Sequence, residues 1–495
     1  MRAFFLSVRY PDRTNEESAY DNRETTDVKK AAPFILVAFL FVGIAFFAFH
    51  ERYSPRYDAE YIGAATCGEC HTQIYPEWQR SPHANMLREP DARSVVGDFS
   101  DASWTLPEAD QQNSLDAQPA ARMFSDAGKY FMALRVPGEE SFEAFQIDYV
   151  VGYQYRQVYL TREAGGVLRR LPLQWSVPRQ EYFPYWNLQE GSTPSVQDLR
   201  AQMTSMNSAW NLFCARCHTT HLTIHEKNAS HTFANVEWTD KGIACEACHG
   251  PGSLHQDYFS SNYINRIAGW LNSKLRGQPV AYIANATKLD KGEAMSVCGR
   301  CHGSDIYLAG TDVYRTFEPG YSREGHTNDL SAYFQSAPLT PNRAVATLET
   351  YADGEPKGVG MLFRSLIESK CYQQAEVRCY DCHNPHDNKL PAKAGILFPS
   401  DSSNDYCIGC HQDLRERVGD HTGHETGTAG SYCYDCHMPK IITKLATGIW
   451  ETTRTHRMSL IPERPEAFGD GPGITPNACL QCHGVSAPDF PDTYQ

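Results

Sequence analysis

The order of hydrophobic and polar positions divides the chain into stretches of different character. Residues 31–49 form an uncharged apolar run of 19 residues, long enough to cross a bilayer as a helix. Residues 95–190 carry short runs of β-branched and aromatic side chains, broken by Pro-Gly, Gly and Gly-Gly, which is typical of strands joined by turns. Elsewhere we expect short helices in irregular chain, with one longer helix around Met361–Gln374 and no solenoid repeat.

Four runs carry the strand signal of the β-rich stretch, and each ends near turn residues. They are Lys129–Val136, Phe145–Val151, Tyr153–Thr161 and Gly166–Trp175. We therefore interpret residues 95–190 as a β-rich insertion.

The flanks of the apolar run predict its orientation in a membrane. Six Lys and Arg residues precede it, with Lys29 and Lys30 at its edge, whereas only Arg52 and Arg56 follow closely, among acidic residues. This asymmetry places the N-terminus inside and the rest of the chain outside. A cleaved signal peptide remains an alternative, although the small-X-small site at residues 43–45 lies within the run.

The composition and net charge limit the kinds of partner that the chain can bind. The 495 residues have a formal net charge of −14, with 29 Pro and 35 Gly. The length alone would allow two or three domains. Such an acidic surface argues against nucleic acid and favours either a basic or small protein partner, through electrostatic steering, or simple solubility.

The chain contains eight copies of Cys-X-X-Cys-His, which use all but one of its 17 cysteines. In chain order, motifs 1 to 8 begin at Cys67, Cys214, Cys245, Cys298, Cys379, Cys407, Cys433 and Cys479, have their second cysteine at Cys70, Cys217, Cys248, Cys301, Cys382, Cys410, Cys436 and Cys482, and end at His71, His218, His249, His302, His383, His411, His437 and His483. This spacing is the attachment signature of c-type haem. On one helical turn the two thiols reach the two vinyl groups of one porphyrin, and the histidine faces its iron. A single copy could instead be a zinc cluster or a redox dithiol, but eight copies all ending in His favour haem.

Eight covalently bound haem c groups then predict the architecture and location. We expect a mainly α and irregular multihaem cytochrome c fold organised around eight haems, with a β-rich insertion and one N-terminal transmembrane helix. Its parts would be a cytoplasmic leader (1–30), a membrane anchor (31–50), a first haem segment (51–94), the β insertion (95–190) and a heptahaem core (191–495). Since haem is attached outside the energy-coupling membrane, we expect a single-pass protein of the inner (cytoplasmic) membrane with its haem domain on the periplasmic or outer side.

The remaining histidines are candidates for the second axial position of each iron. Of 19 His, eight end a motif, and His50 at the end of the apolar run is discounted. Ten remain: His83, His221, His225, His231, His255, His326, His386, His421, His424 and His456. All eight haems could therefore be bis-histidine. His221 and His386 follow their own motifs too closely to reach around the same macrocycle, so we expect each to serve a different haem.

From Tyr61–Leu87 onward the chain resembles a family of multihaem cytochromes c, often fused to tetratricopeptide repeats, that is related to the hydroxylamine oxidoreductase group. Further similar segments are Tyr149–Leu160, Trp210–His218, Gly242–His255, Val297–His302, Ser369–Leu390, His421–Pro439, Thr455–Met458 and Pro476–His483. The resemblance implies distal ligands at His83, His255, His386, His456 and one or both of His421 and His424, and more weakly at His326. Two features depart from the family: no tetratricopeptide repeats follow, and Cys371 stands where the family has Met.

Three functions remain open from the sequence. The first is a membrane-anchored electron carrier between a membrane redox complex and a periplasmic or extracellular acceptor. The second is a multihaem oxidoreductase that acts on a small nitrogen or sulfur compound at one five-coordinate haem; no motif ends in Lys, as a nitrite reductase of the lysine-ligated kind would require. The third is a structural cytochrome subunit. Expected partners are membrane or periplasmic redox proteins, possible further copies of the chain in a larger complex, and no nucleic acid.

Overall fold

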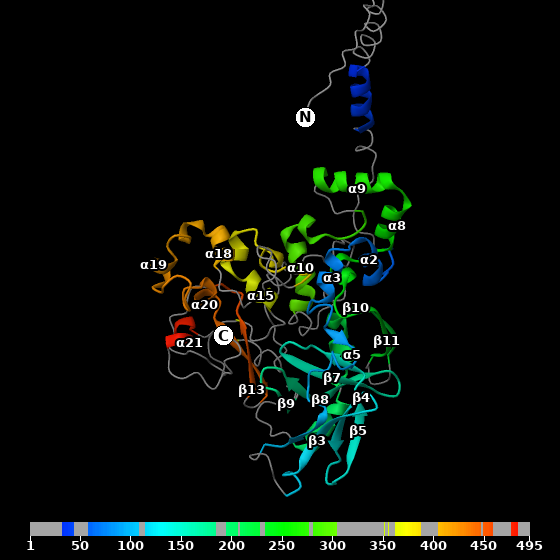
Figure 1. The fold of residues 1–495 in the computed structure, drawn as a ribbon, viewed down its shortest axis with the longest axis vertical. Coiled ribbons are helices and arrows are strands. Elements are labelled where there is room, and N and C mark those ends of the chain that lie inside the picture. Colours follow the sequence, from blue (N-terminus) through cyan, green and yellow to red (C-terminus); the bar gives the residue numbers. More distant parts are fainter. Residues whose placement is uncertain are drawn as a thin grey trace, which may run out of the picture.

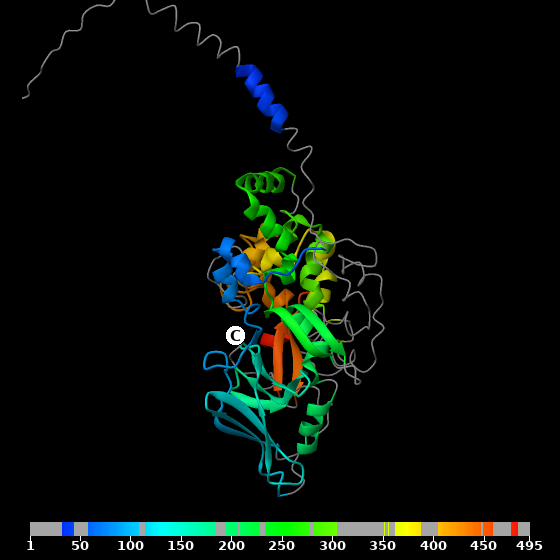
Figure 2. The ribbon, with the colours of Figure 1, turned by 90° about the vertical axis from the view of Figure 1, so that its right-hand side faces the viewer.

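The computed structural model describes residues 32–43, 58–107, 114–184, 195–205, 208–227, 233–276, 281–303, 351, 355, 362–387, 404–446, 449–458 and 477–483. The body is elongated, with the strands of the β insertion at one end and most of the short helices at the other (Figure 1). A view turned by 90° shows the same division (Figure 2). The chain therefore separates a β-sheet unit from the helical region that carries most of the motifs.

The β insertion consists of two antiparallel sheets. One sheet has the order β2-β3-β4-β5, formed by Ser100–Thr105, Pro119–Asp126, Lys129–Arg135 and Phe142–Gln146. The other has the order β1-β6-β7-β8-β9, formed by Leu87–Arg88, Tyr149–Val151, Arg156–Arg162, Leu168–Ser176 and Glu181–Pro184. Strand β1 belongs to the segment that follows motif 1, so its pairing with β6 joins the first haem segment to the insertion.

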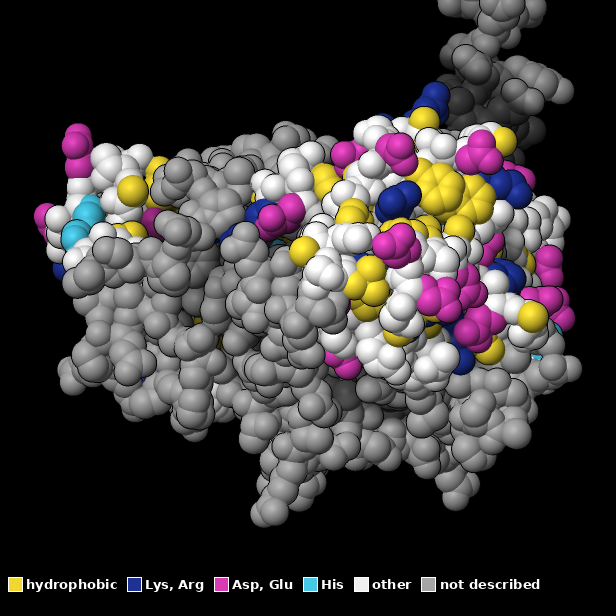
Figure 3. Space-filling view, turned by 90° about the horizontal axis from the view of Figure 1, so that it is seen from below, with side chains coloured by type: hydrophobic (Ala, Val, Ile, Leu, Met, Phe, Trp, Pro, Cys, Tyr) yellow, Lys and Arg dark blue, Asp and Glu magenta, His cyan; other side chains and the backbone are white. Residues whose placement is uncertain are grey.

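The two sheets share one hydrophobic core. Met123 of β3 and Met132 of β4 are directly opposite in register and fully buried, and they cluster with Tyr159 and Leu171 of the second sheet. Helix α4 (Val196–Thr204) covers this core with Leu199. On the face seen from below, acidic and basic side chains are interspersed with apolar ones (Figure 3). The apolar side chains thus fill the space between the sheets, and β8 is buried along its whole length instead of alternating between buried and exposed residues.

Each motif lies on or beside a short helix. These helices are α2 (Ala64–Cys70), α6 (Ala215–His218), α7 (Cys245–His249), α10 (Lys291–His302), α17 (Cys379–Cys382), α18 (Asp405–Cys410), α20 (Cys433–His437) and α21 (Ala478–His483). A single turn is enough to set the two thiols of a motif on one face. The haem segments therefore need little regular structure.

One longer helix was expected around Met361–Gln374, and this expectation is wrong. The chain forms two short helices instead, α15 (Leu362–Ile367) and α16 (Lys370–Gln374). Ser369 separates them because it adopts an extended conformation and its side chain accepts a hydrogen bond from the Tyr372 N–H as the N-cap of α16. Phe363 of α15 and Tyr372 of α16 then pack with Met295 of α10.

Two hairpins outside the insertion were not expected from the sequence. They are β10 (Thr219–Lys227) with β11 (Phe233–Lys241), and β12 (Lys440–Ala446) with β13 (Ile449–Arg454). The first begins directly after motif 2 and ends four residues before motif 3. The second begins three residues after motif 7, and residue 456 follows its end closely.

The expected anchor is described only in part. Residues 32–43 are helical, and Phe34, Phe39 and Leu40 on this helix are exposed. Within the described ranges, no helix combines the length and apolar character that crossing a bilayer requires.

Candidate functional site: paired histidines at the haem motifs

The structure places a second histidine opposite the histidine of six motifs. The ring centres of these pairs are 5.8–6.4 Å apart. The pairs are His71 with His255, His302 with His83, His249 with His386, His383 with His456, His437 with His421, and His483 with His424. Motifs 1, 3, 4, 5, 7 and 8 therefore each face an imidazole supplied by another part of the chain.

This separation fits a metal between the rings rather than ring stacking. A metal–imidazole bond of about 2.0 Å, with about 1.1 Å from that nitrogen to the ring centre, puts two trans imidazole centres roughly 6.2 Å apart. By contrast, the rings of His221 and Tyr61 are in direct contact, with centres 3.9 Å apart. The six separations thus match the distance expected across one iron atom, and the donor set fits bis-histidine haem.

Hydrogen bonds orient several of these rings. The Nδ1 atoms of His83, His249 and His255 lie 3.2, 2.8 and 3.0 Å from the backbone carbonyl oxygens of Pro385, Ala284 and Ala281. Those of His424 and His456 lie 2.8 and 3.1 Å from the carbonyl oxygens of residues 422 and 454. Since a carbonyl only accepts, Nδ1 carries the proton and donates, which leaves the Nε2 lone pair for a metal.

Burial keeps many of these rings neutral. Burial, together with the neighbouring imidazoles, lowers the pKa of His302 and of His456 to about 4. Burial also lowers the pKa values of His83, His249 and His386. Neutral imidazole is the form that binds a metal, so these sites need no deprotonation at neutral pH.

Two motif histidines, His218 and His411, face no other histidine among the described residues. Of the candidates named from the sequence, His221 stacks on Tyr61 with its Nδ1 2.9 Å from the Thr239 hydroxyl, and His225 pairs with Glu237 at 3.1 Å. His50, His231 and His326 lie outside the described residues. The structure therefore brings His83, His255, His386, His421, His424 and His456 to motifs and places His221 and His225 elsewhere.

The surroundings of His218 differ from those of the six pairs. The ring is enclosed, and its Nδ1 is buried with no hydrogen-bond partner in the described part of the chain. Burial and the positive charges of Arg156 and Arg170 together lower the pKa of His218 to about 4. Arg156 begins β7 and Arg170 lies on β8, so the β insertion supplies two cations to motif 2. Sequence reasoning missed both, because arginines in a strand pattern give no signal of a haem neighbour.

Contacts between motif cysteines order the motifs in space. Thiols of motifs 1 and 3 (Cys67, Cys245), 4 and 5 (Cys298, Cys379), and 6 and 7 (Cys407, Cys433) lie close enough to interact. Thiols of motifs 3 and 4, 5 and 6, and 7 and 8 are close enough to interact electrostatically. The motifs thus follow the series 1-3-4-5-6-7-8. Motif 2 branches from motif 4, where the Cys217 thiol lies 3.9 Å from the Arg300 carbonyl oxygen.

The seventeenth cysteine, Cys371, belongs to no motif and lies on α16. It is partly buried and close enough to Cys410 of motif 6 for the two thiols to interact electrostatically, and burial raises the pKa of Cys371. No disulfide forms among the 17 cysteines, each of which lies in the described ranges. Sixteen thiols are therefore available for thioether bonds.

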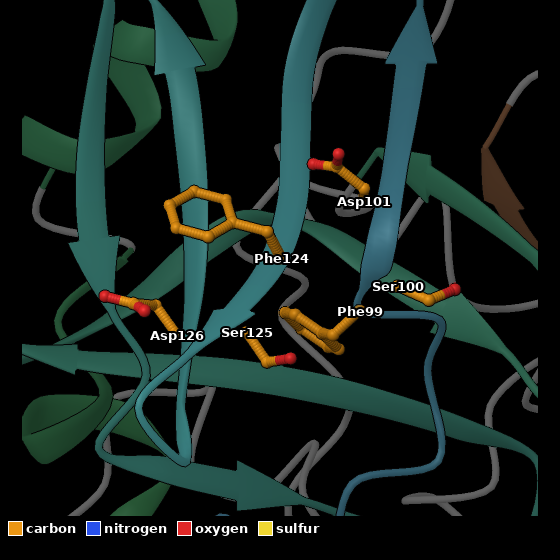
Figure 4. A pocket seen from close by; sticks show the side chains of 6 residues that line it. All are labelled: Phe99, Ser100, Asp101, Phe124, Ser125 and Asp126. Atoms are coloured by element: carbon orange, nitrogen blue, oxygen red, sulfur yellow. The ribbon is translucent and has the colours of Figure 1, made fainter.

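A hollow in the β insertion lies apart from all of these residues. Figure 4 shows its lining: Phe99, Ser100, Asp101, Phe124, Ser125 and Asp126. None of them belongs to a motif or to a histidine pair, so the candidate site is the paired histidines and not this hollow.

Comparison with known proteins agrees with these motifs. Residues 373–416 match the doubled CXXCH motif family, and residues 66–113 and 186–250 match the family described as cytochrome c554 and c-prime. The chain is 21% identical over 427 residues to the dissimilatory sulfite reductase MccA of Wolinella succinogenes, covering 78% of this chain. It spans about half (51%) of that relative's length.

Two solved structures are also similar to the chain. One is the outer cell wall cytochrome OcwA, with 16% identity, coverage of 88% of this chain and 86% of that one, and a TM-score of 0.47. The other is the octahaem sulfite reductase MccA of Wolinella succinogenes, with 16% identity, coverage of 84% and 61%, and a TM-score of 0.27. The motifs and the matched families identify the chain as a multihaem c-type cytochrome. It binds haem c through Cys-X-X-Cys-His motifs and is related to the dissimilatory sulfite reductase MccA.

Proposed function

We propose that the chain is an octahaem electron-transfer protein. The observation that carries this proposal is the set of six facing imidazole pairs, because paired imidazoles fill both axial positions and exclude water and small substrates from the iron. Bound haem supplies a one-electron ferric/ferrous couple. The attachment cysteines of successive motifs lie near one another along the series 1-3-4-5-6-7-8 and would hold neighbouring haems close, which would suit electron movement from one end to the other.

We further propose that residues 31–49 anchor the protein in the cytoplasmic membrane, with the motifs on the outer side. The apolar run and the Lys and Arg residues before it support this orientation. The partners would be a membrane redox complex as donor and a periplasmic or extracellular protein as acceptor. Carbonate washing of membranes tests the anchor: the full chain should remain with the membrane, and its release would contradict the proposal.

A second candidate function rests on motif 2. His218 faces no other histidine among the described residues, and Arg156 and Arg170 place positive charge beside it. Such cations suit a small oxyanion, and a relative is described as a dissimilatory sulfite reductase. In this alternative, motif 2 would carry a five-coordinate haem at which a small sulfur or nitrogen compound reacts. Electrons would pass between this haem and the rest of the series by way of motif 4.

Protein-film voltammetry of the full holoprotein separates the two functions. An electron carrier should give reversible waves that sulfite, nitrite or hydroxylamine leave unchanged. A catalytic current with one of these compounds would overturn that proposal. If the current fell in Arg170→Gln but persisted in Arg122→Gln, whose guanidinium lies over the ring of Phe142, it would assign catalysis to motif 2.

A further inference from the structure

Helix α9 (Tyr263–Arg276) turns its large apolar side chains outward. Tyr263, Ile264, Ile267, Trp270 and Leu275 are 72%, 64%, 46%, 60% and 68% exposed. The side facing the body carries small or polar residues instead, among them Ala268 and Asn272, which are 1% and 3% exposed. A surface helix of a globular protein ordinarily has the opposite arrangement. An exposed apolar face of this kind is typical of a surface that contacts a partner or a membrane.

The positive charge of α9 favours contact with a negatively charged surface. The helix contains Arg266, Lys274 and Arg276 and no acidic residue, although the chain as a whole has a net charge of −14. Arg266 and Lys274 are exposed, beside the apolar residues. Trp and Tyr with flanking Lys and Arg are the residues of helices that lie in the headgroup region of a bilayer.

The position of α9 connects it to the N-terminal apolar run. Helix α8 (Ser253–Ser261) leads into α9, and its first residue is hydrogen-bonded to Glu60, where the chain enters the body: the Glu60 N–H donates to the Ser253 hydroxyl at 2.8 Å, and the Ser253 N–H donates to the Glu60 carbonyl at 3.1 Å. Residues 44–57 span at most about 50 Å. Figures 1 and 2 both show α9 at the end of the body nearest the N-terminal helix.

We propose that α9 lies on an anionic phospholipid bilayer, with its apolar face in the headgroup–acyl boundary and its cations beside the phosphates. The inference rests on the proposed anchor, which would bring this end of the body to the membrane. Because motif 1 begins seven residues after Glu60 and lies beside motif 3, such a contact would hold motifs 1 and 3 near the membrane. Electrons would then enter at one end of the series and leave at the other.

Spin labels on the full-length holoprotein in phosphatidylglycerol–phosphatidylethanolamine vesicles test this contact. The parent is Cys371→Ser, since Cys371 is the one cysteine outside the motifs. Labels are placed at Ile267→Cys and Ile264→Cys on α9. The matched control is Tyr155→Cys, which replaces an exposed apolar residue of the β insertion. Relaxation by oxygen, which partitions into lipid, is compared with relaxation by a water-soluble nickel chelate.

The expected result is that oxygen relaxes both α9 labels several-fold more strongly, relative to the nickel chelate, than it relaxes the control label. Equal access of the chelate to α9 and control labels would overturn the proposal. Labels shielded from both reagents would also overturn it, because they would show a protein partner or a second copy on α9. Carbonate washing of the same vesicles distinguishes the α9 contact from the N-terminal anchor. If the protein stays with the vesicles while the α9 labels are accessible to the nickel chelate, only the α9 contact is refuted.

Discussion

The ring of His386 lies opposite that of His249, with centres 6.3 Å apart and planes within 4° of parallel. His386 follows motif 5 by three residues, yet it faces the histidine of motif 3. The ring of His383 is instead opposite that of His456, with centres 6.1 Å apart. These two pairs thus join motif 3 to the segment after motif 5, and motif 5 to the segment after β13.

Replacing His386 by Met should raise the potential of one haem, because a thioether ligand favours ferrous iron more than imidazole does. We expect a shift on the order of 0.1 V, within the roughly 0.8 V range that axial ligands cover. Potentiometric titration followed by magnetic circular dichroism measures it. His225→Met is the control, since His225 pairs with Glu237 and should leave the titration unchanged.

The double variant His386→Met/His456→Met tests whether His386 and His456 are ligands of different haems. If the two histidines serve different irons, two haems shift, each by about its single-variant amount. A single shifted haem would show that His386 and His456 serve one iron.

Gly299→Ala should destabilise the haem region. A Cβ at Gly299, inside motif 4, would lie 2.6 Å from the ring of the buried Phe363. Overpacking of this kind costs about 1–3 kcal/mol. Gly409→Ala is the matched control within motif 6, where nothing lies within 4 Å of an added Cβ, so helix propensity should leave it neutral or stabilised by up to about 1 kcal/mol. Thermal unfolding of both holoproteins measures the difference, and equal effects would contradict the packing.

The stability contributed by Glu246 should depend on pH. This buried carboxylate of motif 3 accepts hydrogen bonds from the N–H groups of Ile62, Gly63 and Gly252. Burial nevertheless raises its pKa above the usual 4.5. The folded state therefore keeps the proton longer than the unfolded chain, so the group's stabilisation is complete below about pH 4.5 and is lost as the pH rises through the raised pKa.

Glu246→Gln removes this titration. Measured from pH 4 to pH 8, the Tm of the natural protein should fall relative to that of the variant as the pH rises. Glu69→Gln, at the exposed position beside the second cysteine of motif 1, is the control and should follow the natural protein throughout. A Tm difference between Glu246→Gln and the natural protein that is constant with pH would contradict the assignment.

The intact mass should exceed that of the polypeptide by eight haems, since eight complete motifs are present. Cys371 should be the one thiol that alkylates after denaturation, because the other sixteen cysteines would be thioethers. Seven or fewer haems in fully matured protein would refute the octahaem assignment.

Local features could be predicted from the sequence. A motif fixes its own cysteines and histidine within one turn, and the runs at residues 129–136 and 166–175 give strands β4 and β8 because β-branched and aromatic composition and flanking turn residues are local signals. The division of residues 361–374 into two helices depends on the N-cap bond of Ser369, which a helical pattern does not reveal.

Long-range pairings could not be derived from the sequence alone. Nothing near His83 indicates that it faces His302, because this pairing depends on how the first haem segment folds back on the core. By its position beside a motif, His221 was as good a candidate for a distal ligand as His386. Because His221 lies in the β10–β11 hairpin, however, its ring stacks on that of Tyr61. The two arginines at motif 2 come from the β insertion, whose sequence predicts strands and not their haem neighbour.

The most direct test of the central claim, that six facing imidazole pairs each hold one haem iron, is low-temperature electron paramagnetic resonance of the fully oxidised full-length protein, with spin quantification. The pairing predicts low-spin ferric signals that integrate to at least six irons. Any high-spin iron should be confined to the haems of motifs 2 and 6. Fewer than six low-spin irons, in protein whose mass includes eight haems, would contradict the account.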